Sequence, residues 1–246
     1  MNKYWEFTKN QGNPDEPVEL RITGDIVDDE RVWIYDWFGD DCTSPNAFRN
    51  ELNEHAGKDL TVWIDSYGGN PFAGAGIYNA LKEHDGKITV KIDGKAMSAA
   101  SVIAMAGDEV LMSPVAMMMI HNPLTGIWGD QHELRKVADV LDEIKESIMN
   151  SYVIKTGMDR ESVSNMMDEE TYMSAEKAVA NGFADGVMYS NGLFEVKNYK
   201  GLSFNRSGVL NSAHKSIQQA IELLDDKSKA KEPEESLEMV LKLYQE

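Results

Sequence analysis

Three short segments carry groups that could act together in nucleophilic chemistry. They are a glycine turn at residues 66–70 (Ser-Tyr-Gly-Gly-Asn), Ser98, and His121. A serine hydroxyl becomes an effective nucleophile when a histidine takes its proton. Backbone N–H groups beside glycines can stabilise the oxyanion that then forms. These residue types are those of an acyl-transfer site.

Each segment taken alone has a simpler explanation. A pair of glycines is needed in many tight loops. Ser98 opens an apolar segment of small residues, where serine commonly caps a helix. His121 ends an apolar run before Asn-Pro, a position where a histidine is more often structural or exposed. The case for chemistry therefore depends on whether the fold brings the three segments together.

Alternating strand and helix patterns predict that the three segments meet at one edge of a mostly parallel sheet. Strand patterns occur at 18–27, 60–64, 88–92, 110–112 and 116–120, and helix patterns occur at 45–55, 72–84 and 97–106. We expect a turn at 65–69, after the second of these strands. Such alternation indicates βαβ units, whose ligands bind beyond the carboxyl ends of the strands. That edge can bring a serine at a helix start within hydrogen-bond reach of a histidine at a strand end.

The remaining chain is predicted to be mostly helical. A long helix is expected over 130–155, because apolar residues recur there at helical spacing. They are Leu134, Val137, Leu141, Ile144 and Ile148. Short helices near 159–168 and 174–181 precede a last turn and strand. A change in composition then divides the chain into a domain of residues 1–205 and an acidic, partly helical tail of residues 206–246.

Composition argues against several classes of function. The chain has 24 Lys and Arg against 42 Asp and Glu, and this net charge of −18 argues against nucleic-acid binding. The single cysteine, Cys42, excludes an intrachain disulfide and a multi-cysteine metal site, and we expect no metal or cofactor. No apolar run approaches the roughly 20 residues that span a bilayer, and the N-terminus lacks the apolar core of a signal peptide. We therefore expect a cytoplasmic protein without a membrane partner.

Four motifs, in order along the chain, resemble those of the Clp peptidase family. The Ser-Pro-Gly-Gly turn of the family is similar to Ser-Tyr-Gly-Gly at 66–69, and its stretch before the nucleophile is similar to Gly-Lys-Ala-Met-Ser at 94–98. Its Met-Ile-His-x-Pro strand resembles residues 119–123, and its Phe-Leu-Ser-Ala motif with the following Ala, Gly and Asp resembles residues 172–185. The resemblance implies the α/β spiral of β–β–α units that Clp peptidases share with crotonases, with a long handle helix, here followed by the C-terminal tail.

The resemblance also implies roles for single residues. Ser98 would attack a peptide carbonyl, and His121 would take and later return its proton. The backbone N–H groups of Gly69 and Ala99 would hold the oxyanion, with Gly68 beside them in the turn. The implied activity is hydrolysis of polypeptide substrates through an acyl-enzyme.

The acid of the triad is less certain in the sequence. The family position of the aspartate, two residues before the aromatic residue of the Phe-Leu-Ser-Ala motif, falls on Glu170, and Asp168 matches another acidic position of the family. A glutamate can orient an imidazole as an aspartate does. We expect Glu170 to complete the triad, with Asp168 as the alternative. Each residue alone could also belong to a solvated helix end.

The resemblance extends to partners. It implies a homo-oligomeric ring, a heptamer or a stacked tetradecamer, in which the 130–155 helix is the handle between rings. The apolar stripe of this helix would equally suit packing in the core of the subunit itself. Tyr67 replaces the proline of the family and leaves both glycines in place. An N-terminus unlike that of housekeeping Clp peptidases and the acidic tail are more similar to Clp-like proteases of tailed phages, which mature the viral head. A capsid or scaffold protein in the host cytoplasm is then the expected substrate, and the alternative is a Clp proteolytic subunit served by an AAA+ ATPase.

Three rival functions stay open at this point. A crotonase-type acyl-CoA enzyme shares the fold and an oxyanion hole but does not need the pair of Ser98 and His121; a fluorophosphonate that labels the wild type but not Ser98→Ala would exclude it. A relative of the signal-peptide peptidases would use serine with lysine, and His121 argues against it. The third rival is a non-catalytic assembly or scaffold protein that keeps the fold without the activity.

Overall fold

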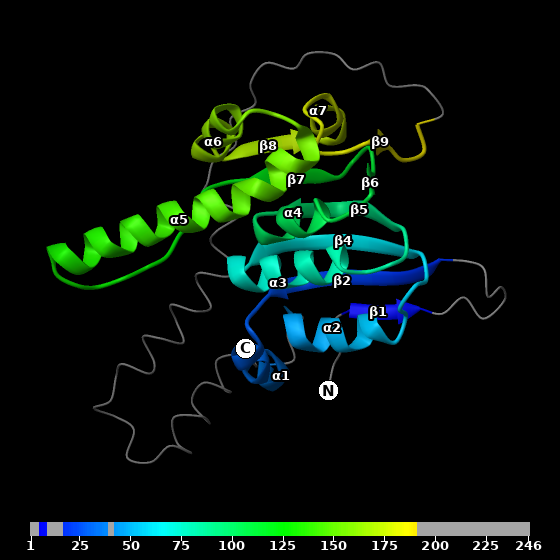
Figure 1. Ribbon diagram of the computed structural model, residues 1–246, viewed down its shortest axis with the longest axis horizontal. Helices are drawn as coiled ribbons and strands as arrows, with labels where there is room; N and C mark the ends of the chain where they lie inside the picture. The colour runs from blue at the N-terminus through cyan, green and yellow to red at the C-terminus, as the bar shows by residue number, and fades with distance from the viewer. Residues whose placement is uncertain (1–4, 9–16, 39–41, 191–246) are drawn as a thin grey trace, which may run out of the picture. The chain divides into compact units, whose positions relative to one another are not determined.

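A mixed sheet whose central strands run parallel forms the frame of the protein (Figure 1). The computed structural model describes residues 5–8, 17–38 and 42–190. The main path of the sheet has the order β1-β2-β4-β5-β6-β9, and β3, β7 and β8 pair outside this path. The strands are β1 (Trp5–Thr8), β2 (Val18–Ile26), β3 (Cys42–Thr43), β4 (Leu60–Gly69), β5 (Ile88–Met97), β6 (Glu109–Met112), β7 (Met117–Ile120), β8 (Thr171–Ser174) and β9 (Gly186–Val187). The predicted α/β class is confirmed.

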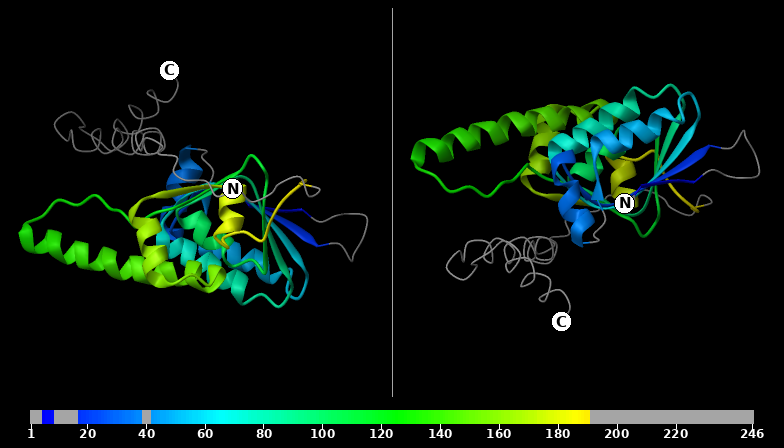
Figure 2. Two further views of the ribbon diagram at one scale, coloured as in Figure 1. Left: turned by 90° about the horizontal axis from the view of Figure 1, so that it is seen from above. Right: turned by 90° about the horizontal axis from the view of Figure 1, so that it is seen from below.

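Helices cover one face of the central strands. α2, α3 and α4 lie side by side on this face in Figures 1 and 2. The helices are α1 (Val32–Phe38), α2 (Pro45–Asn53), α3 (Pro71–Lys82), α4 (Ala99–Ala104), α5 (Gln131–Thr156), α6 (Arg160–Asp168) and α7 (Ala175–Ala180), with a 3-10 turn, η1 (Asp29–Arg31), before α1. Because the helices cover one face only, the side chains on the opposite face of the central strands are polar or half-buried.

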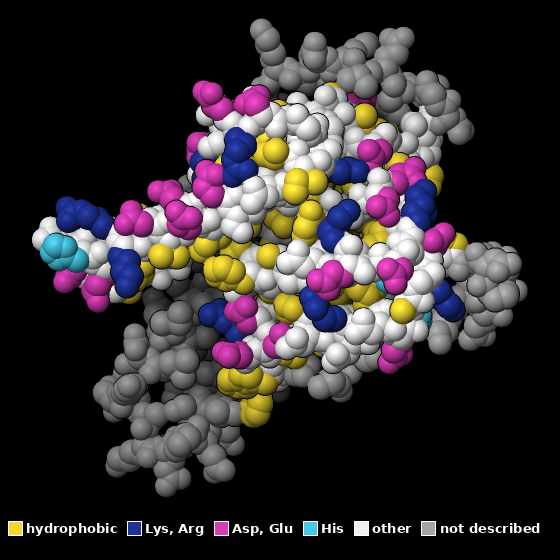
Figure 3. Space-filling view, viewed as in Figure 1, with side chains coloured by type: hydrophobic (Ala, Val, Ile, Leu, Met, Phe, Trp, Pro, Cys, Tyr) yellow, Lys and Arg dark blue, Asp and Glu magenta, His cyan; other side chains and the backbone are white. Residues whose placement is uncertain are grey.

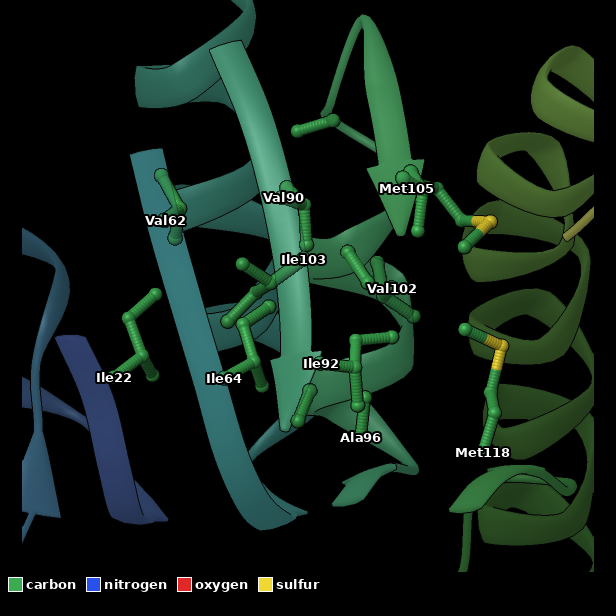
Figure 4. Close-up of a cluster of buried hydrophobic side chains, with 14 of the residues drawn as sticks. Ile22, Val62, Ile64, Val90, Ile92, Ala96, Val102, Ile103, Met105 and Met118 are labelled. Carbon is green, nitrogen blue, oxygen red and sulfur yellow. The ribbon is translucent and has the colours of Figure 1, made fainter. Parts of the chain in front are cut away.

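The core lies between the central strands and α4. Val62 and Ile64 of β4 are fully buried, whereas Trp63 between them is half-buried on the other face, as the two-residue period of a strand requires. Figure 4 shows these side chains with Val90 and Ile92 of β5 and with Val102 and Ile103 of α4. Burying such a side chain contributes roughly 1.5–3 kcal/mol. The core therefore holds β5 and α4 firmly on either side of the single residue between them.

β4 and β5 run further than the sequence predicts. The expected strands at 60–64 and 88–92 continue to Gly69 and Met97, so the prediction of a turn at 65–69 is wrong. The glycine segment stays paired with β2 across one register shift, because Thr23 pairs with Asp65 and Asp25 with Gly68, so that β4 has one residue more than β2 there. The pairing of β4 with β5 also shifts, between Ile64 and Ser66 of β4. Such bulges bend a strand and redirect its side chains, often beside active sites.

The predicted long helix is α5, and it packs on the body only through its C-terminal half. Asp130 and Glu133 form a capping box at its start, and its buried residues are Met149, Ser151 and Tyr152. The N-terminal half projects from the body in Figures 1 and 2, and Leu134 and Val140 are 46% and 48% exposed. Figure 3 shows hydrophobic side chains along this projecting part. The apolar stripe is therefore not part of the core of the subunit over that half.

Three expectations concern features outside this frame. The predicted tail at 206–246 lies outside the described residues. In the described part of the chain, no helix is both long and apolar enough to cross a membrane, and no cluster of three or more His, Cys, Asp or Glu side chains could hold a metal ion. The single cysteine, Cys42, is buried in β3.

Candidate active site

Ser98 occupies a strained turn between β5 and α4. Its φ of 52° and ψ of −126° are rare for a residue with a side chain and cost roughly 1–3 kcal/mol. The backbone is held there because the Ser98 N–H donates to Met119 O of β7 at 3.0 Å. A sharp strand-to-helix turn of this kind exposes a serine hydroxyl at the top of a sheet. The Ser98 side chain makes no cap bond to α4, so the simpler explanation of this serine as a helix cap does not hold.

His121 directly follows β7 and faces that hydroxyl. Parallel pairing of β5 with β7 aligns Met97 with Met119, which brings the residues beyond both strand ends to one edge. The distance from His121 Nε2 to Ser98 Oγ is 2.8 Å. This is within the 2.6–3.2 Å that a general base needs to take a proton. The structure thus brings together the serine and the histidine that the sequence singles out.

The glycine segment at the end of β4 passes close behind Ser98. A Cβ on Gly68, whose φ is 100°, would lie 2.5 Å from Met97 O and 2.8 Å from both Ala99 N and Ser98 Cβ. A Cβ on Gly69 would lie 2.1 Å from Ile26 O of β2. Both positions therefore need glycine, because the backbone of β4 lies close to β2 and also close to the turn at Ser98, here called the nucleophile turn.

The two glycines differ in burial. Gly68 is buried, and its N–H donates to Ser66 Oγ at 3.0 Å; Ser66 Oγ in turn donates to Gly24 O of β2 at 2.6 Å. Gly69 is exposed at the strand end. Ala99 is the first residue of α4, where backbone N–H groups have no partner within the helix. The Ala99 nitrogen is therefore without a helical partner, and it would lie 2.8 Å from a Cβ on Gly68.

Ser66 is a site residue to which the sequence reasoning assigned no role. It is buried, and its hydroxyl bridges Gly24 of β2 and Gly68 of β4 within the register shift between these two strands. The available signal was a small hydroxyl residue directly before two glycines at the end of an apolar strand. Sequence alone does not reveal its partner, Gly24, because that contact spans 42 positions.

The two candidate acids have different surroundings. Asp168 is exposed, and its carboxylate accepts hydrogen bonds from Asn122 Nδ2 and Lys145 Nζ, both at 2.7 Å. The bond from Asn122, followed by that from Lys145, holds the pKa of Asp168 below its usual value. Asp168 is thus hydrogen-bonded to Asn122, the residue that follows His121.

Glu170 lies in the turn directly before β8. The antiparallel pairing of β7 with β8 ends at Ile120 and Thr171, so His121 and Glu170 are the residues that adjoin its last pair. Glu170 has a φ of 50° and is not itself part of the strand. Its Oε1 accepts from Tyr172 Oη at 2.9 Å. The segments that carry His121 and Glu170 are therefore joined through the β7–β8 pairing.

Backbone strain marks the same residues. In the described part of the chain, three residues other than glycine have positive φ, namely Ser98, Glu170 and Tyr189. Strain of this kind persists where the surrounding structure holds it, and it gathers at functional sites. Two of the three strained residues are thus the candidate nucleophile and a candidate acid.

Comparison with known proteins identifies similar chains. The family model described as Clp protease matches residues 50–191, more than half of the chain. The "ATP-dependent Clp protease proteolytic subunit" of Ligilactobacillus salivarius is 31% identical over 133 residues, which cover 53% of this chain and 68% of the relative. The protein of the same name from Porphyromonas gingivalis is 29% identical over 137 residues, covering 55% of this chain and 62%, less than two thirds, of the relative.

Proposed function

The chain belongs to the Clp protease family of serine endopeptidases, and we propose that it hydrolyses peptide bonds through an acyl-enzyme formed on Ser98. The observation that carries this proposal is the 2.8 Å contact between Ser98 Oγ and His121 Nε2 at a strained strand-to-helix turn. A serine that merely capped a helix would need neither the strain nor the imidazole.

The pair supports a two-step reaction. Ser98 Oγ bonds to the carbonyl carbon of the scissile peptide while its proton passes to His121 Nε2. His121 then donates that proton to the leaving nitrogen as the C–N bond breaks, which leaves an ester on Ser98. Water attacks the ester, its proton passes to His121, and the same proton returns to Ser98 Oγ when the acid product leaves.

Backbone N–H groups of Gly69 and Ala99 would stabilise the oxyanion of each tetrahedral intermediate. The Gly68 N–H is bonded to Ser66 Oγ, which leaves the exposed Gly69 as the donor from β4. Donors fixed in a site of this kind act without reorganising during the reaction, and losing one typically costs about 3–4 kcal/mol of transition-state stabilisation. Gly68 contributes by leaving the space that a side chain would fill.

Glu170 is the acid that we assign to the triad. Its place beside the last pair of the β7–β8 ladder, next to the end of β7 that carries His121, supports this role, since the carboxylate of the third residue must reach the imidazole from the side away from the serine. The bonds of Asp168 to Asn122 and Lys145 support a different role for that residue, which is to hold the loop after His121 in place.

Peptide cleavage tests the proposal directly. Wild-type protein should cleave a fluorogenic peptide and yield products with a new carboxyl terminus, identified by mass spectrometry, and Ser98→Ala should lose this activity. Hydrolysis that survives in Ser98→Ala, or a folded and assembled wild type that cleaves nothing, would refute the proposal. Turnover of an acyl-CoA thioester that is unaffected by Ser98→Ala would favour the crotonase alternative.

Two biological settings for this chemistry differ in how the polypeptide substrate reaches the active site. The relatives carry names that describe ATP-dependent proteolytic subunits, which supports a homo-oligomeric ring in the cytoplasm served by an AAA+ ATPase. The N-terminal sequence, unlike that of housekeeping Clp peptidases, and the acidic composition of 206–246 support the phage setting, with a capsid or scaffold chain as substrate. We favour the phage setting; cleavage of a folded scaffold protein without ATP is the expected result, and a strict need for an ATPase would overturn this choice.

A further inference from the structure

A buried hydrogen-bonded chain lies behind the nucleophile and ends on the backbone carbonyl of Ser98. That oxygen accepts from the Ser101 N–H at 2.9 Å and from Ser101 Oγ at 2.6 Å. Ser101 Oγ is 2.8 Å from Tyr152 Oη. Ser101 belongs to α4 and Tyr152 to the packed half of α5, so the chain connects two helices through the carbonyl beside the reacting hydroxyl.

The two side chains are sealed from solvent. Ser101 is 0% exposed and Tyr152 is 1% exposed, and the Tyr152 ring packs on Phe183 with ring centroids 5.7 Å apart. Burial raises the pKa of the Tyr152 phenol, which keeps it a neutral donor at working pH. A buried hydroxyl pair of this kind is costly unless each group is bonded, so its presence requires an explanation.

The number of available protons determines the donor and the acceptor in each of these hydrogen bonds. The Ser101 hydroxyl has one proton, and its 2.6 Å contact to Ser98 O uses that proton because a carbonyl can only accept. Tyr152 must therefore donate its own proton to Ser101 Oγ. The two bonds point the same way, toward Ser98 O, and bonds in such a chain strengthen one another.

Hydrogen bonds that hold the carbonyl of Ser98 also fix the direction of the Ala99 N–H. The peptide bond from Ser98 to Ala99 is planar and trans, so its C=O and its N–H point in opposite directions. Rotation of that peptide plane would swing the Ala99 N–H away from the Ser98 side chain. The bonds from Ser101 N–H and Ser101 Oγ to this oxygen oppose the rotation, and Tyr152 supports the second of them through its own bond to Ser101 Oγ.

We propose that Ser101 and Tyr152 are positioning residues that aim the backbone N–H of Ala99 at the oxyanion. The inference rests on the proposed peptidase function and adds to it a device outside the triad and the glycine segment. A serine in the first turn of a helix commonly bonds to a carbonyl three positions back, which local geometry explains. Local geometry does not explain a fully buried phenol supplied by α5, 51 positions away.

Single-oxygen truncations test the inference. Ser101→Ala and Tyr152→Phe each remove one hydroxyl, and Tyr152→Phe keeps the ring that packs on Phe183. We expect Ser101→Ala to lower kcat by about tenfold or more on a fluorogenic peptide, with KM changed by less than about twofold, because the lost orientation matters mainly in the transition state. Tyr152→Phe should lower kcat by a smaller factor. The double variant should be no worse than Ser101→Ala, because Tyr152 acts through Ser101.

Ser151→Ala is the matched control. Ser151 precedes Tyr152 on α5 and is also buried, but its hydroxyl donates to Ile148 O of its own helix at 2.8 Å. We expect its kcat to equal that of the wild type. A peptide aldehyde, which forms an oxyanion on Ser98, should show inhibition constants that rise in Ser101→Ala and Tyr152→Phe in proportion to the loss of kcat.

The outcomes separate this inference from the proposed function. An active wild type together with folded Ser101→Ala and Tyr152→Phe variants whose kcat is within twofold of it would overturn the inference alone. Equal losses of kcat in Ser151→Ala would also overturn it, because a general packing defect would then be the cause. A wild type that neither cleaves peptide nor reacts with a fluorophosphonate would overturn the proposed function, and this inference with it.

Discussion

Adding one methyl group at Gly68 should disable the site more than it destabilises the fold. The Cβ of Gly68→Ala would stand 2.5 Å from Met97 O and 2.8 Å from Ala99 N. Ordinary contact begins at 3.4 Å, so the backbone of β4 and that of the nucleophile turn must separate by as much as 0.9 Å, the difference between 3.4 and 2.5 Å. The atoms that move are those that position the Ser98 hydroxyl and the Ala99 N–H.

The expected magnitudes follow from this displacement. Misplacing catalytic groups by about 1 Å can cost about a hundredfold in rate, so we expect kcat/KM of Gly68→Ala to fall by about that factor. The φ of 100° adds a backbone cost of at least about 1–2 kcal/mol for any L side chain. In a domain of this size, 1 kcal/mol lowers the melting temperature by about 2–4 °C.

Gly57→Ala separates the two effects. Gly57 has a φ of +74°, and a Cβ there would meet no atom within 4 Å. This variant should lose about 1–2 kcal/mol of stability with unchanged kcat/KM, since only the backbone cost applies. Peptide hydrolysis and thermal melts on both variants decide the matter. A folded Gly68→Ala with kcat/KM within twofold of the wild type would refute the argument that this glycine holds the nucleophile turn in place.

Three further predictions concern the acids and the projecting helix. Glu170→Gln should lower kcat by about a hundredfold or more and Asp168→Asn by less than about tenfold, measured by peptide hydrolysis; the reverse order would assign the triad to Asp168. Since the folded pKa of Asp168 is lowered, its stabilisation is present above the ordinary carboxyl pKa of about 4 and is lost as pH falls through the folded value. Thermal melts should therefore show the wild type and Asp168→Asn converging in acid, and a constant difference down to pH 2 would contradict this. Leu134→Asp should change the free energy of unfolding by less than about 0.5 kcal/mol because the side chain is 46% exposed, but should lower the assembly mass in sedimentation; an unchanged mass would argue against a ring contact through α5.

The sequence predicts the frame of the site well because that frame is local. Strand and helix periods identify β2, α2, α3, α5 and the first parts of β4 and β5, and the parallel order of β2, β4 and β5 follows from their alternation with helices. Ser98 and His121 each follow a strand directly, so the common edge of parallel strands suffices to bring them together.

Local sequence patterns do not predict backbone features that depend on contacts between distant segments. The strand pairing of the glycine segment depends on a register shift between β2 and β4, and β4 shifts again relative to β5; no local pattern predicts either shift. The sequence patterns do not identify β8, which pairs antiparallel with β7 and is directly preceded by Glu170. Tyr152 continues the apolar stripe of α5 one step beyond Ile148, but only the packing of α5 on α4 indicates its contact with Ser101.

Covalent labelling of Ser98 tests the central claim most directly. Wild-type protein should react with a fluorophosphonate to give a single adduct, and peptide mapping should locate it on Ser98. His121→Ala should lose labelling by about a thousandfold in rate, because the hydroxyl then has no base, while Ser98→Ala should not label at all. An adduct on another residue, or labelling of His121→Ala at the wild-type rate, would contradict the account.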